Sequence, residues 1–184
     1  MSRGGRLFAV LLTAVWALMG PAATPAWAQA APGGNLEYAV KANYLVRFAA
    51  FVEWPPRAFA NAQAPVVICV AGHDPFGATL DRAARGQTAY GRPLTVRRPA
   101  TREATAGCHI LYAGTGAETL ISPKTDRAGL LMITDSAVAP ERGMIHFVLS
   151  EARVRFHIDQ QAATRSGLVI SSRLLNLALT VREG

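Results

Sequence analysis

Residues 65–71, PVVICVA, form a continuous apolar run in which most residues are β-branched. A run of this kind, without polar alternation, is typical of a strand that is buried on both faces of a sheet. Two later segments have the same character, residues 108–113 (CHILYA) and residues 129–134 (GLLMIT). The sequence therefore predicts at least three buried strands.

Helical segments are expected between these strands. Gly72 ends the first run, and Asp74 followed by Pro75 is expected to cap and open a helix. Residues 92–97 alternate as a short strand would, and residues 101–106 are expected to form a short helix or turn. Repeated strand–helix units predict an α/β fold with a mixed, mostly parallel sheet and helices on both faces.

The pattern changes in the C-terminal third of the chain. Residues 144–149 and 153–158 have the pattern of two strands around a turn at residues 150–152, which predicts a β-hairpin. A short helical stretch follows, and Ser171 or Ser172 is expected to start a final, leucine-rich helix. The hairpin contributes antiparallel strands, so the predicted sheet is mixed.

The first helix of the domain is expected to end within residues 48–56 (FAAFVEWPP). Apolar residues before this point recur at three- and four-residue spacing, and Asn35 is expected to cap the helix. Pro55 and Pro56 stop the helix, and a following proline disfavours the α region at Trp54. We expect the Trp54 ring to pack back on the core as a lid, which is favoured over a ligand-binding role.

The N-terminus has the layout of a secretory signal peptide. Arg3 and Arg6 form a basic start, and residues 7–19 form an apolar run that is too short to cross a bilayer comfortably. Small residues then lead to a cleavage site after Ala28 or Ala30. We therefore expect export, and an uncleaved membrane anchor is the less favoured alternative.

This layout divides the chain into three parts. We expect residues 1–28 to be the signal peptide, residues 29–34 to be a flexible leader and residues 35–184 to form a single domain, a length that can bury a substantial core. No later stretch is long and apolar enough to cross a membrane. The mature protein is therefore expected to be soluble and exported.

The charge of the chain argues against nucleic-acid binding. The formal net charge is +7, and removal of residues 1–28, with two arginines and no acid, lowers it by two to +5. These charges are spread along the chain, without a block of lysines and arginines of the kind that binds phosphates. Export would also separate the protein from the chromosome.

Cys69 and Cys108 are the only cysteines. In an oxidising compartment, an isolated pair is most simply a disulfide. In the chain-entropy description, closing a loop of this length stabilises the fold by roughly 4 kcal/mol. Two thiolates alone would form an incomplete metal site, so metal binding is disfavoured.

The glycine-rich segments do not match a nucleotide site. Residues 114–116 (GTG) lack the third glycine of a dinucleotide-binding turn. Residues 72–77 (GHDPFG) lack the lysine of a P-loop, and Pro75 removes an amide that a phosphate cradle would use. We predict no cofactor.

The polar residues mostly have structural explanations. His146 and His157 would lie opposite each other if the hairpin loop had two residues, and ordinary strand histidines are favoured over a metal site. Asp159 is expected to cap a helix, and Arg153 and Arg155 to lie on the solvated face of a strand. No catalytic motif such as Gly-x-Ser-x-Gly occurs. We therefore predict no catalytic or metal-binding residues and favour a binding protein over an enzyme.

Four segments resemble the YfiR/HmsC family of periplasmic proteins, and together they cover nearly all of the exported chain. Those segments are Val40-Lys41-Ala42 with Tyr44-Leu45, Phe48 and Phe51 to Pro55; Ile68-Cys69-Val70 with Gly72 and Asp74-Pro75-Phe76-Gly77; Cys108-His109-Ile110-Leu111; and Gly143, Ile145, Phe147, Val154-Arg155-Phe156, Ile158, Gly167-Leu168, Ile170-Ser171-Ser172, Leu174-Leu175 and Leu177-Ala178.

This resemblance implies a function that composition and spacing do not show. The best-known members repress a diguanylate cyclase of the inner membrane by binding its periplasmic domain, which lowers cyclic di-GMP output and biofilm formation, and redox or envelope stress relieves the block. The resemblance also implies a homodimer and an α/β sandwich. The partner-binding surface is not predicted.

The chain departs from the family pattern at one point, and one alternative function is left open. Some family members have a second cysteine pair near the hairpin, which this chain lacks, so Cys69 and Cys108 are slightly favoured as a structural rather than a redox-active pair. The alternative function is a periplasmic small-molecule-binding protein without a cyclase partner. Its pocket would be formed by Trp54 and residues 72–77.

Overall fold

The structure is a computed structural model that describes residues 32–119, 127–138 and 143–183. Side-chain positions in the first helix are described from Leu36 onward. The predicted signal peptide lies outside the described residues, so its cleavage stays a prediction.

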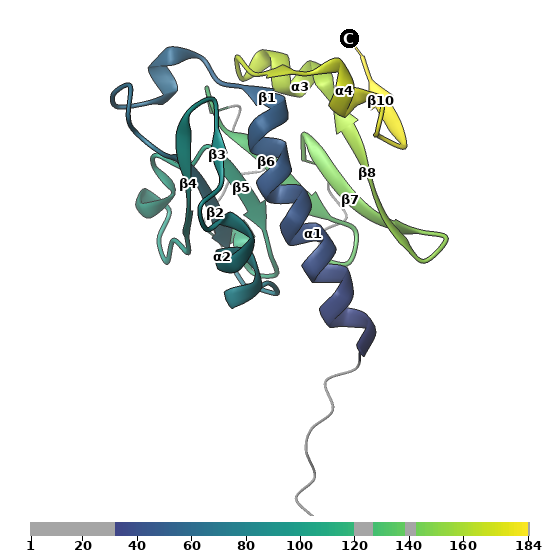
Figure 1. The fold of residues 1–184 in the computed structure, drawn as a ribbon. Coiled ribbons are helices and arrows are strands. Elements are labelled where there is room, and N and C mark those ends of the chain that lie inside the picture. The colour runs from purple at the N-terminus through teal and green to yellow at the C-terminus, as the bar shows by residue number, and fades with distance from the viewer. Residues whose placement is uncertain (1–31, 120–126, 139–142, 184) are drawn as a thin grey trace, which may run out of the picture.

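Eight strands form the main sheet, in the order β10-β8-β7-β6-β5-β2-β4-β3 (Figure 1). The parallel centre consists of β4 (Arg92–Arg97), β2 (Val66–Ala71), β5 (Ile110–Ala113), β6 (Leu131–Asp135) and β7 (Ile145–Ser150). Antiparallel pairs involve β8 (Arg153–Asp159) with β7 and β3 (Thr88–Ala89) with β4, while β10 (Thr180–Arg182) runs parallel to β8. The predicted mixed, mostly parallel sheet of an α/β fold is confirmed.

Seven helical segments and a small second sheet complete the described fold. The helices are α1 (Pro32–Phe51), η1 (Pro56–Ala58), α2 (Ala78–Ala84), η2 (Glu103–Thr105), η3 (Ala117–Thr119), α3 (Gln160–Arg165) and α4 (Ser172–Leu175). Strands β1 (Val52–Glu53) and β9 (Val169–Ile170) pair antiparallel next to the C-terminal end of α1.

The central strands are buried on both faces, as their continuous apolar runs predict. Every residue of β2 and β5 is buried. Alternate side chains of β2, such as Ile68 and Val70, join the cluster that contains α1, whereas Val67 and Cys69 join a second cluster on the other face. The four α-helices contribute to the first cluster and η3 contributes Ala117 to the second, so the sheet is covered on both sides.

Helix α1 crosses the sheet diagonally and supplies much of the first cluster (Figure 1). Phe48 is fully buried, with ring centroids 5.8 Å from Phe147 on β7 and 5.3 Å from Phe156 on β8. Tyr44, one turn earlier, lies 5.4 Å from Phe156. These aromatic contacts fix the hairpin against the helix.

The corner after α1 has a clear structural cause. The helix ends at Phe51, and β1 then pairs with β9, so that Ser171 N donates a hydrogen bond to Phe51 O. Trp54 is half-buried, and its Nε1 donates a hydrogen bond to the main-chain oxygen of His109 at 3.3 Å. The predicted role of Trp54 as a lid on the core is confirmed.

Several predicted boundaries are wrong by a few residues. Helix α1 begins at Pro32, so it includes the end of the expected leader, and Asn35 lies inside the helix instead of capping it. Asp74 accepts hydrogen bonds from the amides of Phe76 and Gly77 in a local turn, and α2 begins only at Ala78. The Asp159 cap is confirmed, because its carboxylate accepts from Ala162 N at 2.8 Å.

The end of the chain differs more from expectation. The final helix α4 is a single turn that ends at Leu175, although the leucine pattern continues to Leu179. Strand β10 then adds to the sheet edge beside β8, a pairing that three residues of weak pattern do not reveal.

The hairpin has a two-residue loop, which is the condition for His146 and His157 to lie opposite each other. Ser150 pairs with Arg153, and both loop residues have positive φ, 50° for Glu151 and 56° for Ala152, as a type I′ turn requires. His146 therefore pairs with His157, with ring centroids 6.5 Å apart.

The predicted disulfide is present. Cys69 on β2 and Cys108 just before β5 are bonded, with Cα atoms 5.8 Å apart and 39 residues of separation. Both residues are buried in the cluster on the face opposite α1. The bridge thus closes a long loop and ties two adjacent central strands together.

Removing this bridge tests its contribution. We expect Cys69→Ala/Cys108→Ala to lower the free energy of unfolding by about 4 kcal/mol, because the unfolded chain regains the entropy of the open loop. Urea denaturation of the purified protein measures this change. The single variant Cys108→Ala should lose about as much, and an unchanged urea midpoint in both variants would contradict the prediction.

Candidate functional site

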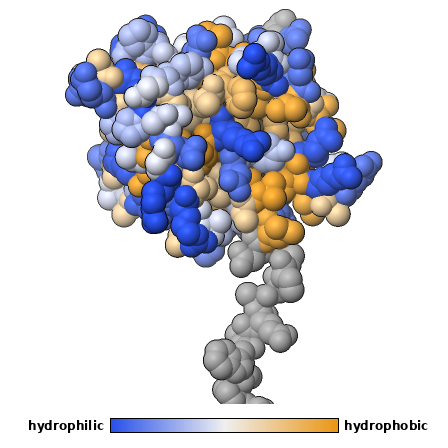
Figure 2. Space-filling model, in the orientation of Figure 1, coloured by the Kyte–Doolittle hydropathy of each residue, from blue (hydrophilic) through white to orange (hydrophobic). Residues whose placement is uncertain are grey.

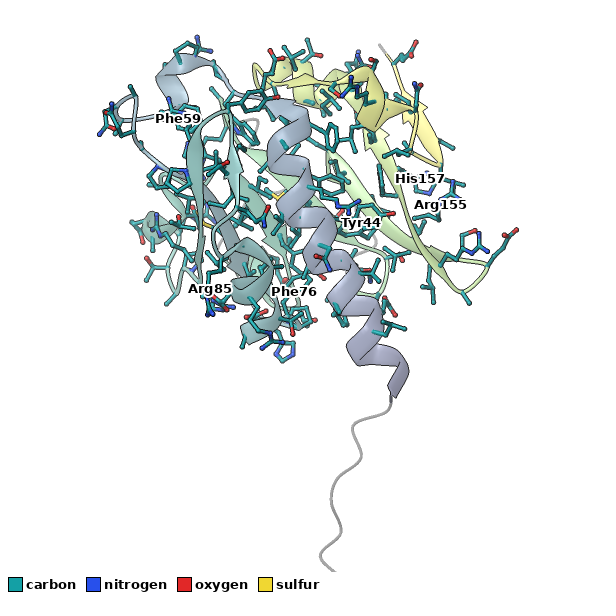
Figure 3. All side chains as sticks on the ribbon, in the orientation of Figure 1. Tyr44, Phe59, Phe76, Arg85, Arg155 and His157 are labelled. Atoms are coloured by element: carbon teal, nitrogen blue, oxygen red, sulfur yellow. A yellow bond between two sulfur atoms is a disulfide. The ribbon has the colours of Figure 1, made fainter. Side chains whose placement is uncertain are left out.

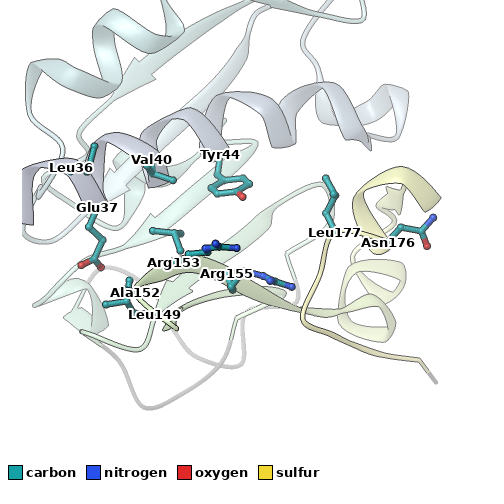
Figure 4. A pocket seen from close by; sticks show the side chains of 11 residues that line it. Leu36, Glu37, Val40, Tyr44, Leu149, Ala152, Arg153, Arg155, Asn176 and Leu177 are labelled. Atoms are coloured by element: carbon teal, nitrogen blue, oxygen red, sulfur yellow. The ribbon is translucent and has the colours of Figure 1, made fainter. Parts of the chain in front are cut away.

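A groove of about 830 Å³ separates α1 from the β7–β8 hairpin (Figure 4). Leu36, Val40 and Tyr44 form the α1 wall at four-residue spacing, and Leu149 stands on the opposite wall. Leu177, in the segment after α4, closes one end. We call this feature the α1–hairpin groove.

The groove gathers exposed apolar side chains. Leu36, Leu149 and Leu177 have exposed fractions of 69%, 56% and 57%, and Val40 is 36% exposed. Figure 2 shows apolar side chains gathered beside the first turns of α1. Single exposed apolar residues are common on protein surfaces, but a contiguous group of them marks an interaction site.

Two arginines give the groove its charge. Arg153 and Arg155 extend from β8 along the groove, next to Tyr44 (Figure 4). Within the described residues, neither guanidinium group has an ion pair or side-chain hydrogen bond. The sequence predicts both arginines on a solvated strand face, and in the structure they line the groove.

A buried ionic network lies beneath the α1 wall. Lys41, only 1% exposed, pairs through Nζ with Asp135 Oδ2 at 2.5 Å and with Glu37. Asp135 ends β6 and is itself 1% exposed, whereas Glu37 also lines the groove. The network therefore connects the groove to the carboxyl end of the sheet.

Two tyrosines complete this network. Tyr112 on β5 donates its hydroxyl hydrogen to Asp135 at 3.1 Å, and the Lys41 ammonium lies 4.8 Å from the ring centroid of Tyr38. Burial, followed by the charge of Asp135, raises the pKa of both tyrosines, so their hydroxyls stay protonated. Burial alone would lower the pKa of Lys41, but its hydrogen bonds to Asp135 and Glu37 outweigh this and raise it.

This network occupies the place where many α/β proteins bind ligands. In open parallel sheets, the crevice at the carboxyl ends of the strands usually holds the ligand. Here Lys41, Tyr112 and Asp135 satisfy one another there. Among the residues that the structure describes, no group of three or more histidine, cysteine or acidic side chains could hold a metal ion.

A model of the YfiR/HmsC-like family matches residues 38–179, which span the fold from α1 to the segment before β10. The chain belongs to the YfiR/HmsC-like family. This family is known for the periplasmic regulation of diguanylate cyclases. No curated protein matches the chain. Across the three described ranges, no helix has the length and apolarity needed to cross a membrane.

The structure excludes the small-molecule pocket that the sequence suggested for this YfiR/HmsC-like chain. Trp54 bonds to His109, at the start of β5, whereas residues 72–77 follow the carboxyl end of the parallel strand β2. The four residues of β5 separate the two by about 13 Å. Trp54 and residues 72–77 therefore lie at opposite ends of the sheet and cannot line one pocket.

Gly72 and Gly114 allow the two loops that contain them to come into backbone contact. A Cβ on Gly72 would lie 2.4 Å from Thr115 O, and one on Gly114 would lie 2.1 Å from His73 O. His73 N donates a hydrogen bond to Thr115 O at 2.8 Å. These glycines serve the contact between the two loops.

His109 contacts the Trp54 corner, and its imidazole ring has a defined tautomer. Val67 N donates to its Nδ1 at 3.1 Å, and Nε2 lies 3.1 Å from Ala58 O, a carbonyl that can only accept. The ring is therefore neutral, with its hydrogen on Nε2, and it stacks on Phe59 at 4.4 Å. Burial lowers the pKa of His109, and the charge of Arg92 lowers it further against the Ala58 hydrogen bond.

The groove of this family member is not predictable from the apolar pattern of the sequence. The apolar pattern of α1 includes Val40 and Tyr44, but it does not distinguish the stripe that faces the groove from the one that contains Leu45 and Phe48. The available signal was the width of the apolar face, since Leu36, Val40 and Tyr44 add a second stripe to the buried one.

The Lys41 network makes a testable contribution to stability. We expect Lys41→Met to lower the free energy of unfolding by about 3–5 kcal/mol, because the buried Asp135 carboxylate loses its partner. The double variant Lys41→Met/Asp135→Asn should recover part of this loss. Urea denaturation measures both, and the exposed Arg47→Met on the same helix is the control, with a change below about 0.5 kcal/mol. A Lys41→Met variant as stable as this control would contradict the prediction.

His109 predicts a pH dependence of stability. Its pKa is lowered in the fold, so the unfolded chain binds the proton more readily. Its contribution is present above the ordinary histidine pKa of about 6.5 and is lost as the pH falls through the lower folded value. His109→Gln cannot gain this proton, so its urea midpoint should fall less than that of the wild type between about pH 7 and pH 5. Equal falls would show that His109 does not contribute.

Proposed function

We propose that this protein is a periplasmic regulator that binds the periplasmic domain of an inner-membrane diguanylate cyclase and holds the cyclase inactive. Membership of the family supports a diguanylate cyclase as the partner and the periplasm as the location. The N-terminal sequence supports export, because it has the layout of a signal peptide. The observation that carries the proposal is the α1–hairpin groove, an exposed apolar surface suited to a protein partner.

The chemistry of the groove suits binding better than catalysis. Its lining combines apolar side chains with two arginines, and its acidic residue, Glu37, is paired with Lys41. A nucleophile with an adjacent base would be needed for covalent catalysis. Among the residues that the structure describes, the groove lining contains no serine, cysteine or histidine.

Repression of a cyclase then requires differential binding only. A regulator shifts an equilibrium between active and inactive states by the ratio of its affinities for the two. Moving a cyclase from almost fully active to almost fully inactive takes a ratio of about 10⁴. A single surface that fits the inactive periplasmic domain can supply this ratio without any reaction.

We propose a structural role for the disulfide in this chain. Cys69 is fully buried and Cys108 is 5% exposed, so a reductant reaches the bridge only after local opening. A properly folded variant without the bridge should therefore still repress. Loss of repression in a folded Cys69→Ala/Cys108→Ala variant would instead assign the bridge a switching role.

Deletion of the gene tests the proposed function. Cellular cyclic di-GMP, measured by mass spectrometry, should rise on deletion because the cyclase loses its repressor. Expression of the full chain should reverse the rise. A version without residues 1–28 is the control and should not reverse it, because it stays in the cytoplasm. An unchanged cyclic di-GMP level across several growth conditions would overturn the proposal.

A further inference from the structure

We infer that the α1–hairpin groove binds an amphipathic helix of another protein, with acidic side chains flanking its apolar face. The identity of that protein rests on the proposed function, whereas the chemistry of the occupant rests on the groove itself. Three features of the groove support this occupant: the shape of the α1 wall, the charge of the hairpin wall and the rigidity of both walls.

The shape of the α1 wall suits a helix. Leu36, Val40 and Tyr44 form a ridge at four-residue spacing, which runs about 12 Å along the helix axis. Ridges of this spacing interdigitate with the corresponding ridges of a second helix in the commonest class of helix packing. Leu149 and Leu177 provide apolar contacts beyond this ridge, so two sides of an inserted helix could be buried.

The charge of the hairpin wall selects an acidic occupant. Arg153 and Arg155 have no carboxylate partner within the described residues, and carboxylates are the groups that guanidinium binds in bidentate geometry. A second copy of the chain would bring a net charge of +5 after signal cleavage. Electrostatic complementarity therefore favours an acidic partner over self-association through this groove.

Both walls are held in place before any partner arrives. Lys41 ties α1 to Asp135 at the end of β6, and Tyr44 packs on Phe156 of β8 at 5.4 Å. Figure 3 shows Tyr44 pointing from α1 toward the hairpin. A preformed groove binds with less loss of conformational entropy than one that must order on binding.

Peptide binding tests this inference. The probe is a fluorescein-labelled amphipathic helical peptide of about 18 residues, with leucines on one face and glutamates beside them, and its counterpart with lysines in place of the glutamates. Fluorescence anisotropy with the exported protein should show at least ~10-fold tighter binding of the glutamate peptide. Added salt should reduce this difference, because it screens the charges.

Matched variants localise the binding. Arg153→Glu/Arg155→Glu should weaken binding of the glutamate peptide at least ~10-fold. The α2 control, Arg82→Glu/Arg85→Glu, makes the same charge change on α2 and at the residue that caps its C-terminus, and should leave binding unchanged. Arg85 lies across α1 from Arg155 (Figure 3). Val40→Glu should weaken both peptides, because it places a charge on the apolar wall.

The other outcomes decide against the inference. Equal affinity for the two peptides, or equal loss in the groove and α2 variants, would overturn it. A dimer in sedimentation that Val40→Glu dissociates, without peptide binding, would assign the groove to a second copy. Vesicles of phosphatidylglycerol that bind the wild type but not Val40→Glu, without peptide binding, would assign it to a membrane.

The inference and the proposed function can fail separately. Groove-dependent binding of the glutamate peptide, together with no change of cyclic di-GMP on deletion, would support the inference and overturn the proposed function. A rise on deletion, without groove-dependent peptide binding, would do the reverse. In cells where deletion does raise cyclic di-GMP, Arg153→Glu/Arg155→Glu should fail to restore repression and the α2 control should restore it.

Discussion

The central strands carry apolar side chains on both faces, and the rest of the fold must cover both. Helix α1 covers one face with Leu45 and Phe48, and the disulfide cluster fills the other. Helix α1 precedes the sheet in the chain, whereas α2 and η3 lie in the long connections that parallel strands need. The Trp54 corner follows from the same constraint, since the chain must leave α1 at the sheet end where His109 accepts the indole hydrogen bond.

Helix α1 has more apolar surface than the sheet can bury. One stripe lies in the core, and the stripe of Leu36, Val40 and Tyr44 faces the groove. The Lys41–Asp135 pair holds this part of the helix over the carboxyl ends of the strands. A buried ion pair adds little net stability compared with apolar packing, but its geometry is specific. In this protein the Lys41–Asp135 pair positions the α1 wall of the groove.

The usual ligand crevice of an α/β sheet is thus occupied by Lys41, Tyr112 and Asp135, and the α1–hairpin groove lies beside it. This arrangement agrees with membership of a regulatory family. A regulator of this kind needs surface complementarity and differential affinity rather than reactive groups. The arginines on β8 and the apolar ridge on α1 are the features that such recognition would use.

The sequence by itself determined the buried strands, the hairpin, the Asp159 cap and the pairing of Cys69 with Cys108, because each depends on neighbouring residues or on a single possible partner. Tertiary structure decided that Lys41 is buried and Val40 exposed, although they are adjacent on α1. Lys41 finds its partner 94 residues away, and Val40 faces a hairpin wall more than 100 residues away along the chain. The local sequence pattern indicates which residues favour burial. Strands and helices that are distant in the sequence determine which side of a helix is covered.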